Sequence, residues 1–237
     1  MNSKDRLIVA LDFDSEDKAI AMVEKLKNDV KFFKVGLELF ISCGPGILER
    51  VREADCAVFL DLKLHDIPNT VRKAAAAAAR LGAFMINVHA SGGYEMMKDT
   101  AEAVAIEADR LGLEAPKILA VTVLTSMDEK ALKKTGIGGS IQKQVLKLAL
   151  LAKDAGLDGV VASAHETALI RKKMGKDFLI VTPGVRPALA AAGDQKRIAT
   201  PRGAIKSGAD YIVVGRPITE ARDPLLAAQS ILKEIEE

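Results

Sequence analysis

The chain has few cysteines, no long apolar run and no basic or acidic tract, and each absence excludes a class of protein. Of its 237 residues only Cys43 and Cys56 are cysteines, in no spacing that suits a metal site or a disulfide framework. This cysteine usage favours a reducing cytoplasm. No apolar run approaches the ~20 residues that a membrane span needs. The polar residues 1–6 run straight into a strand-like segment, so we expect no secretory signal peptide.

Charge is nearly balanced, which argues against a nucleic-acid partner. Lys and Arg number 34 and Asp and Glu 32, for a formal net charge of +2, and the two signs alternate along the chain. An anionic small molecule stays open as a ligand. The sequence has no Walker loop, no glycine-rich dinucleotide fingerprint and no zinc spacing, which excludes the commonest kinase, dehydrogenase and metalloprotease classes. His65, His89 and His165 have no acid or Ser partner in triad spacing, so we interpret them as structural or loop residues.

Eight short apolar segments recur along the chain, and an amphipathic helical segment follows each of them. Apolar runs with little polar alternation are typical of strands buried on both faces, as in parallel sheets. The predicted strands are Leu7–Leu11, Phe32–Val35, Val58–Leu62, Met85–Val88, Ile118–Val121, Gly159–Ala162, Leu179–Val181 and Tyr211–Val214. The predicted helices are Glu16–Lys27, Pro45–Glu53, Pro68–Leu81, Glu95–Leu111, Ser140–Ala155, Glu166–Met174, Pro201–Ser207 and Pro224–Glu236. Proline opens several of these helices and glycine follows several of their last residues, as expected for helix ends.

Eight strand–helix units in one chain of this length predict a single-domain α/β protein, a (β/α)8 TIM barrel. A doubly wound open sheet is the weaker alternative. In a barrel, catalytic residues gather at the C-terminal ends of the strands and in the loops that follow. Catalytic residues of this chain are therefore expected at those positions.

Charged residues stand at the ends of the first three predicted strands. They are Asp12, Lys34, Asp61, Lys63 and Asp66. Taken singly, Asp12 or Asp66 could be a helix cap and Lys34 a solvated strand end. Asp61 and Lys63 carry more weight, because residues two apart on a strand point to the same face and would both project into the barrel mouth.

Two further segments indicate a phosphate site. Gly215 and Arg216 follow the eighth strand, where TIM barrels commonly bind phosphate, and Arg186 follows the seventh. A turn with a surface arginine is the alternative. The long connection 182–200, which contains Gln195, suits a lid over the phosphate, with a floppy insertion as its alternative.

Together these motifs resemble the orotidine 5′-monophosphate decarboxylase family, specifically its shorter bacterial branch, over nearly the whole chain. The signature Asp-x-Lys-x-x-Asp stands here as Asp61-Leu62-Lys63-Leu64-His65-Asp66. The other matching motifs are Val9-Ala10-Leu11-Asp12, Phe33-Lys34-Val35-Gly36, Ile67-Pro68-Asn69-Thr70, Val123-Leu124-Thr125-Ser126, Thr182-Pro183-Gly184-Val185-Arg186-Pro187, Asp194-Gln195 and Gly215-Arg216-Pro217-Ile218-Thr219.

The resemblance implies a cofactor-free and metal-free decarboxylase that converts orotidine 5′-phosphate into UMP and CO2 in pyrimidine biosynthesis. It implies that Lys63, with Asp61, Asp66 and Lys34, carries out catalysis. It also implies a homodimer in which Asp66 and Thr70 reach the partner's active site. The substrate-binding residues that it implies are Asp12 and Lys34 at the ribose, Thr125 and Ser126 beside the pyrimidine, and Arg186, Gln195, Gly215 and Arg216 at the phosphate.

Two other functions stay open from the sequence. The magnesium-dependent keto-gulonate phosphate decarboxylases and hexulose phosphate synthases share the Asp-x-Lys-x-x-Asp motif, but they resemble one another in carrying an acidic residue where this chain has Lys34. The second alternative is a barrel that binds a phosphate ligand without turnover. Lys34, Asp61, Lys63 and Asp66 form an alternating array of charges, in which neighbouring opposite charges favour the charged forms. This charged array argues against a barrel that only binds its ligand.

Overall fold

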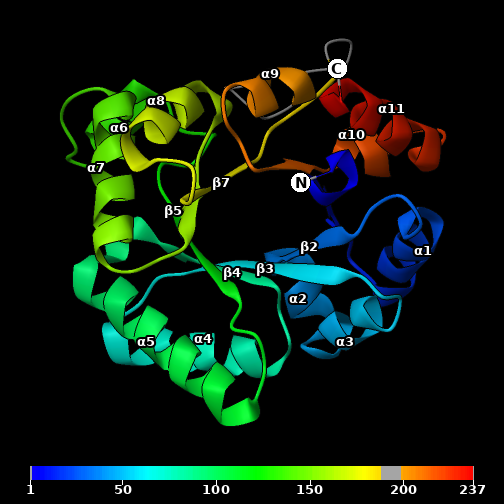
Figure 1. Ribbon diagram of the computed structural model, residues 1–237, viewed down its shortest axis with the longest axis horizontal. Helices are drawn as coiled ribbons and strands as arrows, with labels where there is room; N and C mark the ends of the chain where they lie inside the picture. The colour runs from blue at the N-terminus through cyan, green and yellow to red at the C-terminus, as the bar shows by residue number, and fades with distance from the viewer. Residues whose placement is uncertain (1, 188–198, 237) are drawn as a thin grey trace.

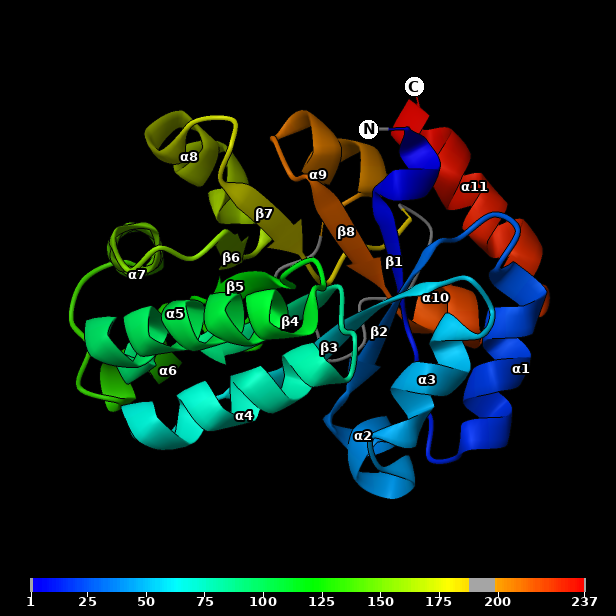
Figure 2. The ribbon, with the colours of Figure 1, turned by 60° about the horizontal axis from the view of Figure 1, so that its bottom comes forward.

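Eight parallel strands close into a barrel in the computed structural model, which describes residues 2–187 and 199–236 (Figures 1 and 2). Each strand pairs with the next in sequence, and β1 also pairs with β8, with Leu7 opposite Ile212. This closing pair excludes the open sheet and confirms the predicted TIM barrel. The strands are β1 (Leu7–Ala10), β2 (Phe32–Gly36), β3 (Ala57–Leu64), β4 (Met85–His89), β5 (Lys117–Val121), β6 (Gly159–Val161), β7 (Leu179–Thr182) and β8 (Tyr211–Val214).

The predicted helices all form, with ends that differ by a few residues. They are α1 (Glu16–Leu26), α3 (Gly46–Arg52), α4 (Pro68–Arg80), α5 (Tyr94–Leu111), α7 (Ile141–Asp154), α8 (Ala164–Met174), α9 (Pro201–Lys206) and α11 (Pro224–Glu236). As predicted, Pro68 and Pro201 occupy first turns, and Gly112 caps α5 in the left-handed conformation at φ 64°. Short helices that we did not predict are α2 (Leu37–Cys43), α6 (Glu129–Lys134) and α10 (Arg216–Thr219), together with two 3-10 turns, η1 (Ser3–Asp5) and η2 (Ala90–Gly92).

Apolar side chains fill two separate layers, which explains why the strands lack polar alternation. One layer lies inside the barrel and includes Phe32, Phe59 and Tyr211. The other lies between the strands and the surrounding helices and includes Phe33, Leu60 and Ile86. Both faces of each strand are therefore buried, as parallel barrels require.

Strand β3 departs from regular pairing at the point where the predicted catalytic residues lie. Leu60 pairs with Ile86 and Leu64 with Val88, so residues 61–63 of β3 stand opposite Asn87 alone on β4. Lys63 has a positive φ of 52°, which non-glycine residues rarely adopt. Such irregularities commonly re-aim side chains beside active sites.

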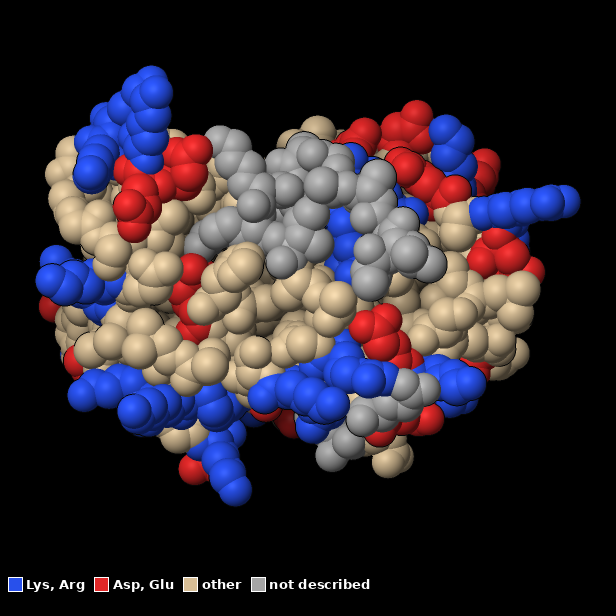
Figure 3. Space-filling view, turned by 90° about the horizontal axis from the view of Figure 1, so that it is seen from above, with Lys and Arg blue, Asp and Glu red and all other residues tan. Residues whose placement is uncertain are grey.

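The molecular surface mixes charges of both signs. On the described part of the face in Figure 3, basic side chains gather along one edge with acidic side chains among them. The view agrees with the balanced composition of the chain. Among the described residues, no helix combines the length and apolar character needed to cross a membrane.

Candidate active site

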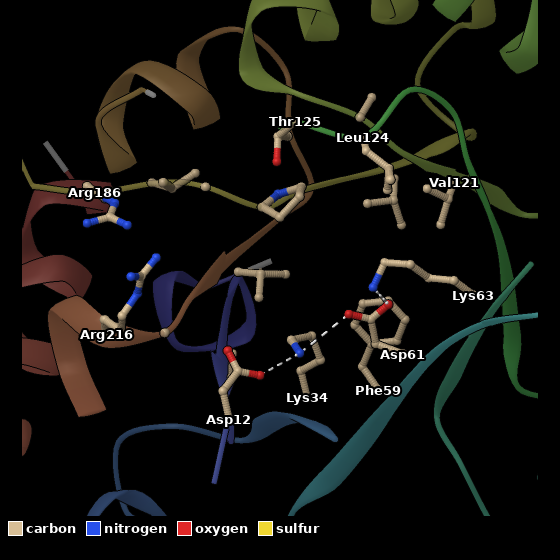
Figure 4. Close-up of a pocket in the computed structure, with 18 of the residues that line it drawn as sticks. Asp12, Lys34, Phe59, Asp61, Lys63, Val121, Leu124, Thr125, Arg186 and Arg216 are labelled. Carbon is tan, nitrogen blue, oxygen red and sulfur yellow. Dashed lines mark hydrogen bonds and ion pairs between the residues drawn. The ribbon is translucent and has the colours of Figure 1, made fainter. Parts of the chain in front are cut away.

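A cavity of about 270 Å³ opens at the C-terminal ends of the strands, where barrel enzymes place their chemistry (Figure 4). Its walls include apolar side chains from inside the barrel, such as Phe59 and Val121. Most of the predicted site residues among those described line this cavity. They are Asp12, Lys34, Asp61, Lys63, Thr125, Arg186, Gly215 and Arg216.

Four of these residues form a chain of alternating charges across three neighbouring strands. The Lys34 Nζ atom lies 3.0 Å from Asp12 Oδ1 and 3.4 Å from Asp61 Oδ2. The Lys63 Nζ atom donates to the other Asp61 oxygen, Oδ1, at 2.7 Å. Asp61 therefore bridges the two ammonium groups, and Figure 4 shows all four side chains directed toward one another.

Burial and charge act in opposite directions on the central pair. Burial by itself would lower the pKa of Lys34, but the carboxylates of Asp61 and Asp12 outweigh it and raise this pKa above its ordinary value. Burial would raise the pKa of Asp61, but Lys34 and Lys63 outweigh it and lower this pKa. Both groups are therefore held in their charged forms at neutral pH.

The side chains of Asp61 and Lys63 share the cavity even though β3 is irregular between them. Leu62 and Leu64 line a separate apolar cavity against α4, on the outer side of β3. Alternation of inward and outward residues thus continues through the irregular segment. The prediction that Asp61 and Lys63 face the barrel mouth together is confirmed.

Asn87 on β4 is a site residue that sequence reasoning missed. It is 1% exposed, and its Nδ2 atom donates to Asp61 Oδ1 at 2.6 Å. Its Oδ1 atom accepts from the backbone N–H of Lys63 at 2.7 Å. A single polar residue inside the apolar segment Met85–Val88 was the available signal, because a buried amide in a strand needs polar partners.

Two histidines stand next to this cluster. The rings of His65 and His89 lie with their centroids 5.4 Å apart, at the ends of β3 and β4. Burial lowers the pKa of His89, and the nearby His65 and Lys63 lower it further. His89 is therefore neutral at pH 7 and adds no charge beside Lys63.

The opposite side of the cavity is formed by arginines and glycines from the last two strand ends. In Figure 4 the guanidinium groups of Arg186 and Arg216 lie on one side of the cavity and the Lys63 ammonium on the other. Arg186 is 8% exposed, so its charge is held largely away from solvent. Gly215 separates β8 from Arg216 and lies beside Asp12, whose Oδ2 atom would be 3.4 Å from an added Cβ. This end can hold an anionic group of a ligand at a distance from Lys63.

Some predicted residues lie outside this cavity. Asp66 and Thr70 are exposed, and the Asp66 carboxylate accepts from the backbone N–H of Ile67 at 2.7 Å. Ser126 is also exposed and does not line the cavity, whereas its neighbour Thr125 does.

Gln195 and residues 188–198 of the predicted lid fall outside the described residues. The described ends of this connection meet in a bridge between Val185 and Ala199.

The acidic side chains of the cavity are not grouped as metal ligands. Within residues 2–187 and 199–236, no three or more His, Cys, Asp or Glu side chains form a group that could hold a metal ion. Asp12 and Asp61 instead share the ammonium group of Lys34.

Comparisons with known proteins agree with this geometry. Residues 5–231 match the model of the orotidine 5′-phosphate decarboxylase / HUMPS family. The orotidine 5′-phosphate decarboxylase of Geotalea daltonii is 52% identical over 230 residues, which cover 97% of this chain and 95% of that protein. That of Moorella thermoacetica is 52% identical over 237 residues, covering 100% and 94%.

Solved structures are similar over the same length. The crystal structure of orotidine 5′-phosphate decarboxylase from Lactobacillus acidophilus superimposes with a TM-score of 0.86 at 42% identity, covering 98% of this chain and 100% of that one. The enzyme from Pyrococcus horikoshii OT3 gives a TM-score of 0.77 at 28% identity, covering 98% and 99%. Fold and sequence similarity therefore both extend over the whole barrel.

Proposed function

The chain belongs to the orotidine 5′-phosphate decarboxylase / HUMPS family, and we propose that it converts orotidine 5′-phosphate into UMP and CO2 without a metal or cofactor. The observation that carries this proposal is the array in which Lys34 bridges Asp12 and Asp61 while Lys63 binds Asp61, opposite two arginines. The chain has two free cysteines, Cys43 and Cys56, which suit a reducing cytoplasm. We therefore propose that the enzyme acts in the cytoplasm.

The proposed reaction needs a positive charge close to one carbon atom. When the bond between C6 and the carboxylate breaks, CO2 leaves and the electron pair stays in the plane of the pyrimidine ring, where the π system cannot delocalise it. The Lys63 ammonium stabilises this carbanion and then donates a proton to C6. Solvent returns a proton to the Lys63 amine after product release.

Asp61 prepares Lys63 for this step. Its lowered pKa keeps it ionised at neutral pH, so it holds the Lys63 ammonium at 2.7 Å before substrate arrives. A charge that is already in place needs no reorganisation during the reaction. Asp61 also stands where it would crowd the substrate carboxylate, which adds ground-state repulsion.

The phosphate is remote from C6, and its binding supplies energy for orienting the reacting ring. Arg186, Arg216 and Gly215 are the described residues suited to hold it, and we assign Gln195 to the same task. Binding energy from a non-reacting group can drive closure over the site and expel water. We therefore propose that residues 182–200 act as a lid over the phosphate.

Lys34 is the feature that favours a metal-free reaction over the metal-dependent members that the family description also covers. Its ammonium lies between the carboxylates of Asp12 and Asp61 and forms an ion pair with each of them. A divalent cation would have to displace this ammonium or bind beside it, against charge repulsion. The residues of this cavity therefore suit a substrate that reacts through lysine.

We further propose that the working unit is a homodimer in which Asp66 and Thr70 complete the partner's site. Both residues are exposed near the barrel mouth, and Ile67 between them is 65% exposed. On the outer side of β3 an apolar cavity lies between α2 and α4, lined by Phe40, Leu62 and Leu64 among others. Apolar surface that is left accessible beside these residues supports an interface with a second copy of the chain.

The lysine variant tests the proposed activity directly. Lys63→Ala should nearly abolish decarboxylation, measured as the decrease in orotidylate absorbance. Binding of UMP should stay largely intact, because Lys63 stabilises the transition state and does not bind the phosphate. Lys143→Ala is the matched control, since this exposed lysine of α7 does not line the cavity. Near-normal turnover by Lys63→Ala would refute the role. A wild-type protein that bound UMP but turned over no orotidylate would favour the non-catalytic barrel.

Subunit exchange tests the shared site. Lys63→Ala and Asp66→Ala dimers should each be inactive, and mixing them should restore activity. With free exchange of equal amounts, half of the dimers are mixed, and one of the two sites in each mixed dimer has native Lys63 and native Asp66. About a quarter of all sites are therefore intact. Heterodimers that form but recover no activity would contradict the shared site and leave the decarboxylase proposal standing.

A further inference from the structure

We propose that Asn87 is a positioning residue that sets both the backbone of Lys63 and the carboxylate of Asp61, an inference that rests on the proposed function. Its amide forms a hydrogen bond with each of them. No hydrogen bond from Asn87 to the substrate is needed for this role.

The first task of Asn87 is to satisfy the irregular backbone of β3. Between the pairs Leu60–Ile86 and Leu64–Val88, residues 61–63 face only Asn87, so regular backbone pairing with β4 is interrupted. The N–H of Lys63 donates instead to Asn87 Oδ1 at 2.7 Å. A buried N–H without an acceptor is costly, and Lys63 has the unfavourable φ of 52° as well. The side chain of Asn87 thus replaces the missing backbone acceptor at the residue that carries the reacting ammonium.

The second task concerns charge. Asn87 Nδ2 donates to Asp61 Oδ1 at 2.6 Å, and the Lys63 ammonium donates to the same oxygen at 2.7 Å. The other Asp61 oxygen faces Lys34. The amide therefore closes a ring that links the Lys63 backbone, the Asp61 carboxylate and the Lys63 ammonium, and it restricts where that ammonium can stand.

Chemistry fixes the orientation of this amide. A backbone N–H can only donate and an ionised carboxylate can only accept, so the oxygen must face Lys63 and the nitrogen must face Asp61. Behind Asn87 lies the outer apolar cavity, whose described lining residues are all apolar apart from Asn87 itself. None of those neighbouring side chains can take over either hydrogen bond if Asn87 is replaced.

Aspartate is the informative replacement because it has the same shape. Asn87→Asp keeps an acceptor for Lys63 N–H but sets a second carboxylate against Asp61. When that carboxylate is protonated, its O–H can donate to Asp61 as the amide does. Activity of this variant should therefore rise as the pH falls. The other titratable groups around this point are Asp61, Lys34, Lys63, His65 and His89, which both proteins share, so the wild-type pH profile is measured beside that of the variant.

The test compares kcat, KM and thermal unfolding of three Asn87 variants with the wild type between pH 5.5 and 8.5. Misplacing a catalytic group by about 1 Å can cost on the order of a hundredfold in rate, so Asn87→Asp at pH 8 should lose about that much in kcat with KM changed by less than about threefold. Its kcat should recover by at least about fivefold as the pH is lowered, whereas Asn87→Leu should lose as much kcat and show no such recovery. Asn87→Ser keeps a hydroxyl too short to reach both partners and should also lose kcat.

The matched control is Thr100→Val, which removes a fully buried hydroxyl that donates within α5, away from the cavity. It should lower the unfolding temperature and leave kcat and the pH profile unchanged. If Asn87→Asp followed the wild-type pH profile, or if folded Asn87→Ser kept wild-type kcat, the positioning role would be wrong. Failure of the wild type itself to turn over orotidylate would instead overturn the proposed function.

Discussion

Gly36→Ala tests whether the exact placement of Lys34 matters to activity separately from folding. Gly36 ends β2 at φ −93° and ψ −175°, a conformation that alanine adopts without strain. A Cβ atom at this position would lie 2.8 Å from Lys34 Nζ, while ordinary contact begins near 3.4 Å. The ammonium would therefore retreat by roughly 0.6 Å to restore an ordinary contact distance.

The size of the effect follows from the charges that Lys34 faces. Lengthening its 3.4 Å separation from Asp61 by that amount weakens the attraction by roughly 0.7 kcal/mol at an effective dielectric constant of about 20. The Asp12 side chain is 55% exposed, so solvent screening makes its contribution smaller. A total loss of about 1 kcal/mol corresponds to a decrease of about fivefold in kcat/KM, expected mainly as a higher KM.

Folding should tolerate the same change. The displaced atom is the end of a flexible side chain, and replacing glycine by alanine in an allowed conformation reduces the entropy of the unfolded chain. This gain offsets the weakened ion pairs of Lys34. We therefore expect kcat/KM for orotidylate to fall while the unfolding temperature stays close to that of the wild type. Gly46→Ala is the control, because no atom lies within 4 Å of its added Cβ. Wild-type kcat/KM in folded Gly36→Ala would refute the reasoning.

Three further changes have distinct expected outcomes. Arg216→Ala should reduce kcat/KM far more for orotidylate than for its phosphate-free nucleoside, and equal losses on both substrates would move Arg216 away from the phosphate. Arg171→Met removes hydrogen bonds to the carbonyls of Gly208 and Phe178 and an ion pair with Asp210. The free energy of unfolding in urea should therefore fall by roughly 3 kcal/mol while kcat stays unchanged. A decrease of less than about 1 kcal/mol would contradict this structural role of Arg171. Hydrogen bonds from Arg110 and Arg80 lower the pKa of Glu107 from 4.5 to about 2. The stability that the ionised Glu107 adds is therefore fully present above pH 4.5 and is lost as the pH falls toward 2. The stability difference between wild type and Glu107→Gln should accordingly narrow from pH 5 to pH 3, and a constant difference would argue against the ion pairs.

The barrel was predictable because its signals are local. Each strand is an apolar run bounded by turn residues, and helices such as α4 and α5 are long enough to show the helical period. Helices α2, α6 and α10 span four to seven residues, and each shares its connection with a second helix, α3, α7 or α11, which the alternation of strands and helices already accounts for. Their existence depends on packing in the finished barrel.

The charged residues of the site were also predictable, since strand ends are where barrel chemistry lies. The role of Asn87 was not, because it depends on the register of β4 against an irregular β3. The placement of Asp66 and Thr70 in a partner's site depends on contacts between two chains, which stay a prediction. Gln195 stays a prediction as well, outside the described residues.

We propose that Lys63, and not a metal ion, carries out the decarboxylation. The most direct measurement follows the loss of orotidylate absorbance with purified protein in excess chelator, with UMP identified as the product. We expect full turnover in chelator and no increase when magnesium is added, because Lys34 occupies the place between Asp12 and Asp61. Loss of turnover in chelator and its return with magnesium would show that the reaction depends on a metal ion.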